Sequence, residues 1–219
     1  MKEMSEVGLR TVAGVAMILV ALTAEWFGGT VFAVFVAAVA TIMYYEWSKL
    51  VQGWGLGWKI AGFFYALFPA LALLWVRERA NMTGGEHEGF SLVLWAFIVT
   101  WAADIGAFFV GRQVGGPKLA PTISPNKTIS GLLGGVAAAT VMAGVWALAR
   151  DLHWVWLVLA PIFALAAAGG DLFESWMKRK AGVKDTGAII PGHGGVLDRL
   201  DGLVPVAILT CLAVLVFGQ

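Results

Sequence analysis

Charged residues of both signs are concentrated between Ser175 and Asp201, a short stretch between two long apolar segments. An ionisable side chain close to hydrocarbon is costly, so a cluster of both signs beside a membrane indicates a functional site. Carboxylates bind hard divalent cations, and lysine and arginine bind phosphates, so this mixture suits phosphate chemistry. The ionisable residues of the stretch include Lys178, Arg179, Lys184, Asp185, His193, Asp198, Arg199 and Asp201.

Acidic residues in two segments have a spacing that places them on one face of a helix. Asp171 and Glu174 are three residues apart, and Asp198 and Asp201 repeat that spacing before the last apolar segment. Two acidic pairs from different helices would meet near one membrane surface, where they could hold Mg²⁺; a second cation is left open. We therefore expect the metal ligands to be Asp171, Glu174, Asp198 and Asp201.

Basic and small residues of the same stretch fit a polyphosphate. Ser175 and Lys178 continue the polar stripe of Asp171 if this segment is helical. The positive charges would neutralise a triphosphate, and Gly194 and Gly195 would let the backbone approach its oxygens. Acids for a metal, bases for phosphate and glycines for access together indicate nucleotidyl transfer.

A second polar group lies upstream, in and after the apolar segment 90–111. Asp104 lies deep in that segment, where a charged side chain costs at least about 2.5–3.5 kcal/mol, so it must face water, a metal or a partner. The helix-free loop that follows would bring hydroxyls and a lysine to the start of the next helix, which attracts anions. The candidate substrate-binding residues of this loop are Ser124, Asn126, Lys127 and Thr128.

The composition is that of an integral membrane protein. Of 219 residues, 59% are hydrophobic and 13% are charged, whereas about a quarter of the residues of a soluble domain are charged. A bilayer crossing needs about 20 apolar helical residues. The fold is therefore predicted to be all-α, a single polytopic domain with about seven transmembrane helices. The predicted spans are 9–26, 28–45, 58–76, 90–111, 129–149, 154–176 and 203–218.

Basic residues orient these spans. Short cytoplasmic loops are enriched in Lys and Arg, and a cytoplasmic N-terminus leaves only three of the 15, Arg77, Arg79 and Arg150, on the outer side. The polar loops 112–128 and 178–202 then face the cytoplasm. A formal net charge of +1 gives no indication of nucleic acid binding, and none is expected.

The two halves of the chain differ in polarity. Residues 1–80 have few polar atoms and are predicted to be scaffold spans, whereas 90–205 form the predicted catalytic region. Glu25 and Glu46 are placed at span ends, where a carboxylate costs little. Tryptophans such as Trp47 fall near predicted interfaces and are interpreted as an aromatic belt.

The ordered string from Ser175 to Asp201 resembles the signature of the phosphatidate cytidylyltransferases, or CDP-diacylglycerol synthases. The resemblance covers roughly residues 100–205 and includes a Ser-Pro-x-Lys-Thr run at 124–128. It implies an enzyme of phospholipid biosynthesis in the bacterial inner membrane, with its site facing the cytoplasm. Such an enzyme transfers CMP from CTP to phosphatidic acid, and a Mg²⁺ cofactor and a homodimer are further expectations.

The resemblance also assigns residues. The implied catalytic residues are Asp171, Lys178, Arg179, Lys184, Asp185, His193, Asp198, Arg199 and Asp201. In two places the chain departs from the usual pattern: Ser130 stands where relatives have Glu, and Ile105 and Phe108 replace a Thr and a Tyr near Asp104. No role of that glutamate can be carried over.

Other interpretations remain open at this stage. A cation- or proton-coupled transporter could use Asp104 and Asp171 as a relay in a midplane site. That interpretation accounts for the buried acids but not for the glycine-rich loop with its Asp-Arg-x-Asp run. His193 could simply order a turn, and the basic run after Lys178 could be a topology anchor.

Overall fold

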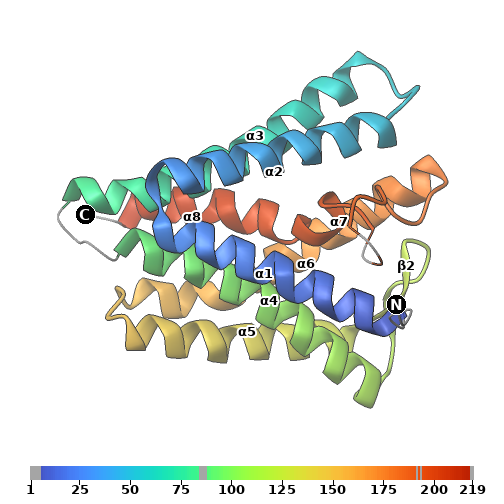
Figure 1. Ribbon diagram of the computed structural model, residues 1–219. Coiled ribbons are helices and arrows are strands. Elements are labelled where there is room, and N and C mark those ends of the chain that lie inside the picture. Colours follow the sequence, from blue (N-terminus) through green and yellow to red (C-terminus); the bar gives the residue numbers. More distant parts are fainter. Residues whose placement is uncertain (1–5, 84–87, 191, 193, 218–219) are drawn as a thin grey trace.

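The computed structural model describes residues 6–83, 88–190, 192 and 194–217. In these residues seven long helices run back and forth across the molecule (Figure 1). They are α1 (Glu6–Phe27), α2 (Gly29–Leu50), α3 (Leu56–Thr83), α4 (Glu88–Val114), α5 (Ile129–Ala149), α6 (Val155–Ala181) and α8 (Leu203–Phe217). The short helix α7 (Leu197–Leu200) precedes α8, and the strands β1 (Lys118–Ala120) and β2 (Ser124–Thr128) lie between α4 and α5.

The helices coincide with the seven predicted segments; the largest difference is at the end of α3, which extends seven residues beyond the predicted span 58–76. Five of them, α2 to α6, are long and apolar enough to cross a membrane, whereas the apolar parts of α1 and α8 are shorter, at Thr11–Phe27 and Leu203–Phe217. The structure therefore confirms a helical integral membrane protein, and the number of crossings stays a prediction.

The polar segments of the chain gather at one end of the helix bundle. The beginning of α1, the turn between α2 and α3, the hairpin and the loop between α6 and α7 lie at the right of Figure 1. The connections from α1 to α2 and from α5 to α6 lie at the opposite end, together with the end of α8. The hairpin and the loop, which carry most predicted site residues, are thus brought to the same end.

Glycines allow α4 and α5 to pack unusually closely. A Cβ at Gly106 in α4 would lie 2.5 Å from the Cβ of Ala138, and a Cβ at Gly135 in α5 would lie 2.5 Å from the carbonyl oxygen of Ala103. Small residues permit this approach where lipid offers no hydrophobic force to drive helices together. The contact fixes the helix that carries Asp104 against the helix that follows the hairpin.

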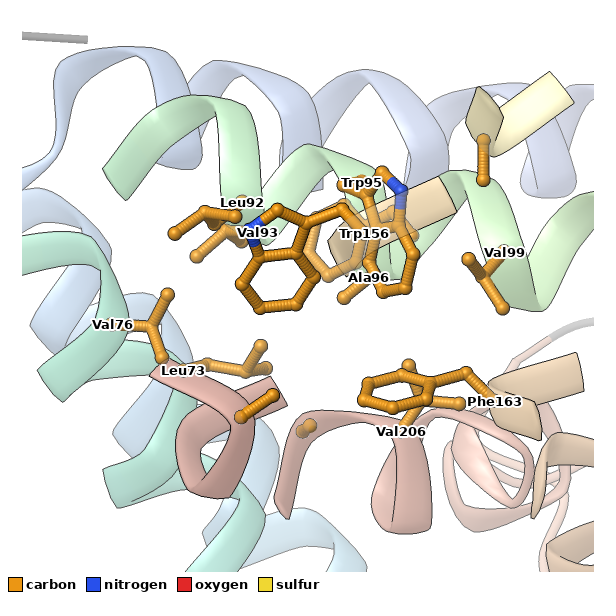
Figure 2. Close-up of a cluster of buried hydrophobic side chains, with 14 of the residues drawn as sticks. Leu73, Val76, Leu92, Val93, Trp95, Ala96, Val99, Trp156, Phe163 and Val206 are labelled. Carbon is orange, nitrogen blue, oxygen red and sulfur yellow. The ribbon is translucent and has the colours of Figure 1, made fainter. Parts of the chain in front are cut away.

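The central core joins α4 to α6 and α8. Trp95 is completely buried, and its ring centroid lies 5.0 Å from that of Trp156 and 5.2 Å from that of Phe163, both in edge-to-face geometry (Figure 2). Val206 of α8 closes the other side of this cluster (Figure 2). Aromatic pairs of this geometry add stability beyond the apolar area that they bury.

Trp47 is not part of an interfacial belt, and that expectation is wrong for this residue. Its side chain is buried between α2, α3 and α6, where it stacks near Tyr65 and Phe173. Its Nε1 donates a 2.7 Å hydrogen bond to the carbonyl oxygen of Trp58, and it fills the space left open by Gly62. The apolar face of α6 therefore packs on other parts of the protein through Phe173.

The predicted loop 112–128 contains a two-stranded hairpin that the sequence did not indicate. Lys118 pairs with Thr128 and Ala120 with Ser124, in antiparallel register with an irregularity between the two pairs. The strands are short and their sequence, with a proline in β2, has no apolar alternation. The hairpin nevertheless holds the loop over the end of α6.

The close packing of α4 and α5 yields a stability prediction. Gly135→Ala should lower the free energy of unfolding by about 1–3 kcal/mol, because its Cβ would overlap the backbone of α4. Gly144→Ala, in the same helix, places its Cβ 3.7 Å from Leu157 and should leave stability unchanged or raise it by up to about 1 kcal/mol. Thermal unfolding in detergent measures both, and equal stability of the two variants would contradict the close contact.

Candidate active site

Lys178 lies at the centre of the charged cluster. It projects from α6, and its Nζ lies 2.7 Å from Oε1 of Glu174, one turn earlier, and 2.8 Å from Oδ1 of Asp198 in α7. All three side chains are largely buried. Opposite charges attract more strongly where water is excluded. The lysine therefore ties the end of α6 to α7 and pairs with two of the predicted metal ligands.

The second carboxylate oxygen of Asp198 organises the loop that precedes it. Oδ2 accepts hydrogen bonds from the backbone N–H of Thr186 at 2.9 Å and of Gly195 at 2.8 Å. Burial by itself raises the pKa of Asp198, but hydrogen bonds, including those from Lys178 and the two N–H groups, outweigh it and lower the pKa to about 2. Asp198 is therefore an anion whose two oxygens are both held by the protein.

Asp171 connects α6 to the hairpin. Its Oδ1 lies 3.5 Å from the hydroxyl of Ser175, and its Oδ2 forms an ion pair with the Nζ of Lys127 in β2. The polar stripe predicted on α6 is present, because Asp171 contacts Ser175 and Glu174 contacts Lys178 along the same helix. The lysine of the upstream loop thus reaches the acids of the downstream segment.

Asp201 completes a convergence of acids from three helices. It is buried at the end of α7, where its Oδ1 accepts a 2.8 Å hydrogen bond from the N–H of Gly202. Burial raises the pKa of Asp201 above its ordinary value, and the negative charges of Asp171 and Asp104 add to this effect. The approach depends on Gly170, because any Cβ there would overlap the carbonyl oxygen of Asp201.

A cavity of about 740 Å³ opens between α4, α5, α6 and the hairpin. Carboxylates line it at Asp104 and Asp171, and polar or basic groups line it at Arg112, Asn126 and Lys127. Several glycines bring bare backbone to the same surface. Basic side chains and accessible backbone N–H groups beside carboxylates suit a ligand that carries phosphates and a cation.

A second cavity, of about 600 Å³, lies between α1, α2, α3 and α8 and is mainly apolar. Its polar end is formed by Asp104, Asp198 and Arg199. Asp104 lines both cavities, so the polar cavity and the apolar cavity approach each other at this carboxylate. Asp104 thus borders space in which a ligand could bind, and its role in binding stays a prediction.

The hairpin residues have distinct roles. Thr128 is the N-cap of α5, since its Oγ1 accepts a 3.0 Å hydrogen bond from the N–H three residues on. Ser130, the residue that replaces an acid, lies 3.0 Å from that hydroxyl and contacts the carbonyl oxygen of Gly115. Arg179 donates to the hairpin turn at 3.2 Å, while Ser124 does not line the polar cavity.

The loop between α6 and α7 places its predicted residues unequally. Lys184 and Asp185 are exposed, and Asp185 lies beside Gly194, which has a positive φ of 84°. The N–H of Gly195 is committed to Asp198. His193 lies outside the described residues.

Sequence reasoning missed Glu46. Glu25 and Glu46 do lie near helix ends, but the expectation that a carboxylate costs little there is wrong, because both side chains are completely buried. Glu25 pairs with Arg77 at 3.1 Å at the far end of α1, and Glu46 contacts the loop before α7. In the sequence Glu46 stands between Tyr45 and Trp47, but this position indicated neither its burial nor its partner.

Comparison with known proteins agrees with this arrangement. The fold and site define a helical membrane protein with a polar cavity, and the model of the cytidylyltransferase family matches residues 56–217. A phosphatidate cytidylyltransferase of Brucella suis biovar 1 is 37% identical to this chain. The alignment, 265 residues long, covers 99% of this chain and 96% of that protein. The chain therefore belongs to the cytidylyltransferase family.

Two further relatives are similar over shorter alignments. A phosphatidate cytidylyltransferase of Staphylococcus epidermidis is 47% identical over 122 residues, covering 54% of this chain and 47% of that protein. One of Haemophilus influenzae is 40% identical over 147 residues, covering 64% of this chain and 51% of that protein. All three relatives are bacterial proteins.

The Lys178 bridge yields a second stability prediction. Lys178→Met should lower the free energy of unfolding by about 3 kcal/mol, because it leaves the buried carboxylates of Glu174 and Asp198 without their cation. The exposed Lys184→Met should change it by no more than about 0.5 kcal/mol. Thermal unfolding in detergent compares them, and a similar midpoint for both variants would show that the bridge adds no stability.

Proposed function

We propose that this protein is a phosphatidate cytidylyltransferase, which transfers CMP from CTP to phosphatidic acid and releases pyrophosphate. The observation that carries the proposal is that a polar cavity and an apolar cavity approach each other at Asp104, beside the acids and bases of the site. A nucleotide and a lipid must meet in this reaction, and membership of the cytidylyltransferase family supports it.

The polar cavity is proposed to bind CTP. Lys127 and Arg112 supply positive charge, Asn126 supplies hydrogen-bonding groups, and the N-terminus of α5 lies beside them. Free backbone N–H groups and the helix dipole favour negative charge at such a point. Asp171 lines this cavity, so a triphosphate there would lie next to one of the converging acids.

The apolar cavity is proposed to bind the acyl chains of phosphatidic acid. Its walls are almost entirely hydrophobic, and its charged lining residues are Asp104, Asp198 and Arg199. A phospholipid has the same division, with apolar chains and one anionic headgroup. Arg199 would attract the lipid phosphate to the end of the cavity that approaches the nucleotide.

The reaction follows from this juxtaposition. An oxygen of the lipid phosphate forms a new bond to the α-phosphorus of CTP, and the bond between that phosphorus and the bridging oxygen of the β-phosphate breaks. Pyrophosphate leaves with the electron pair of the broken bond. When both reactants are held in contact, much of the entropy cost of a bimolecular reaction is met by binding before the chemical step. The positive charges of Lys127 and Arg199 would stabilise the developing negative charge.

Mg²⁺ is the proposed cofactor, and the donor chemistry fits it. Among the described residues no group of three His, Cys, Asp or Glu side chains is assembled to bind a metal, but Mg²⁺ usually takes one or two carboxylates and completes its shell with phosphates and water. Asp171 and Asp201 fit best. Glu174 and Asp198 are held by the largely buried Lys178, whereas the pair of Asp171 with Lys127 is more exposed and lies at the cavity where the cation and its phosphates would bind. When bound, Mg²⁺ would neutralise phosphate charge and orient the leaving group.

The remaining features of the proposal concern the membrane. We propose seven crossings, a cytoplasmic N-terminus and a location in the bacterial inner membrane, because the basic loops and the site share one end of the bundle (Figure 1). CTP is made in the cytoplasm, so the site must open there. A homodimer stays an expectation, and no specific observation favours the transporter alternative over transfer.

The activity is tested by incubating the purified protein in detergent with labelled CTP, phosphatidic acid and Mg²⁺. A labelled CDP-lipid should form, and Asp171→Asn or Asp198→Asn should reduce its rate at least about 100-fold, because each removes charge from the site. Lys59→Ala, an exposed lysine at the start of α3, is the control and should be near normal. Near-normal transfer by Asp171→Asn would remove its proposed role.

Neighbouring glycines in α6 test the convergence of acids. Gly170→Ala should lower the rate of CDP-lipid formation at least about tenfold and raise the Mg²⁺ concentration needed, because its Cβ would push Asp201 away from Asp171. Gly169→Ala meets no atom within 4 Å and should behave like the original protein. Equal rates for both variants would mean that the distance between the two aspartates does not matter.

A further inference from the structure

Glu46 binds the backbone at the start of α7 with both carboxylate oxygens. Its Oε1 accepts a 3.1 Å hydrogen bond from the N–H of Val196, and its Oε2 accepts a 2.8 Å hydrogen bond from the N–H of Leu197. The side chain is 1% exposed, and within the described parts of the chain no ion pair involves it. The two backbone N–H groups are therefore the polar partners of this carboxylate in the described parts of the chain.

The loop is shaped to admit this carboxylate. A Cβ at Gly187 would lie 2.6 Å from Oε1 of Glu46, and a Cβ at Gly195 would lie 2.6 Å from Oε2. Both positions therefore have to be glycine while Glu46 keeps its place. The backbone at Gly187 and Gly195 therefore leaves the carboxylate of Glu46 little room to move.

Glu46 and Asp198 divide the N–H groups of the same loop between them. Asp198 binds those of Thr186 and Gly195, and Glu46 binds those of the next two residues along the chain. One carboxylate comes from α2 and the other from α7 itself. The first therefore fixes the start of the short helix from outside, while the second fixes it from within.

The helix α2 is itself firmly held next to Glu46. Trp47 is wedged against Gly62 of α3, stacks near Phe173 of α6 and donates a hydrogen bond to Trp58. These contacts set the height and rotation of α2. Glu46 therefore transmits the position of α2 to α7, although it lies outside the segment 56–217 that the family model matches.

We infer that Glu46 is a positioning residue for the transfer reaction, which anchors the start of α7 and so aims Asp198, Arg199 and Asp201 at the junction of the two cavities. The inference rests on the proposed function. It assigns part of the active-site architecture to the N-terminal helices, which composition alone describes as scaffold.

The test uses the near-isosteric Glu46→Gln, which replaces one acceptor oxygen by an NH₂ group that opposes a backbone N–H. The rate constant kcat per folded protein should fall about 10- to 100-fold, because a misplacement of about 1 Å can cost this much. The KM for CTP should change less than about threefold, since none of the described residues of 182–202 lines the polar cavity. Hydrogen exchange of the peptide containing residues 194–198 should accelerate at least about tenfold.

Glu25→Gln is the matched control. Glu25 is also completely buried, but it pairs with Arg77 at the opposite end of the bundle. This variant should lower the midpoint of thermal unfolding and leave both kcat per folded protein and exchange at 194–198 unchanged. A loss of kcat equal to that of Glu46→Gln would reduce the role of Glu46 to general stability and overturn the inference.

Two further outcomes separate the inference from the proposed function. If the original protein makes no CDP-lipid, the proposed function fails, while the exchange measurement still decides whether Glu46 anchors the loop. If the original protein is active and Glu46→Gln matches it in kcat and in exchange, the positioning role is wrong. If Glu46→Gln does not fold, Glu46→Asp is used in its place. Its kcat should fall below that of the original protein by less than the loss expected for Glu46→Gln, and an unchanged kcat would overturn the role.

Discussion

The buried ammonium of Lys178 is the interaction on which the site depends. It lies between the carboxylates of Glu174 in α6 and Asp198 in α7. Without it, these two negative charges would repel each other. Its energy is large only because water is largely excluded. Once this bridge is made, the second oxygen of Asp198 can gather the backbone N–H groups of the preceding loop, so one cation organises both the helices and the loop.

Close approach of backbones makes this arrangement possible. Gly170 lets α6 come against the end of α7, and Gly106 and Gly135 let α4 come against α5, so that acids from three helices converge. Like charges held this close are unfavourable without a counter-charge. Lys127 supplies one from the hairpin, and the proposed cation would supply another. Under the proposed function, binding of the cation and its phosphate ligand would relieve this repulsion and stabilise the site.

Much of the fold and of the site could be read from the chain. Runs of about 20 apolar residues predict helices without knowledge of their neighbours, because the bilayer requires internal hydrogen bonding. The stripe from Asp171 to Lys178 follows from helical spacing alone. The hairpin was missed because Ser124 to Thr128 has no strand pattern, and Trp47 was misplaced because an aromatic ring near a span end is equally consistent with an interface and with a core.

The sequence by itself therefore determined the helical membrane fold, the kinds of chemical group at the site and the family resemblance, since each depends on local spacing or on residue type. Only the tertiary structure decided which acid meets which base, that two cavities approach each other at Asp104, and that Glu46 reaches Val196 and Leu197 across 150 residues of chain. The physical reason is that such contacts depend on the relative height and rotation of packed helices. Those are set by the summed packing of many side chains, which no single segment encodes.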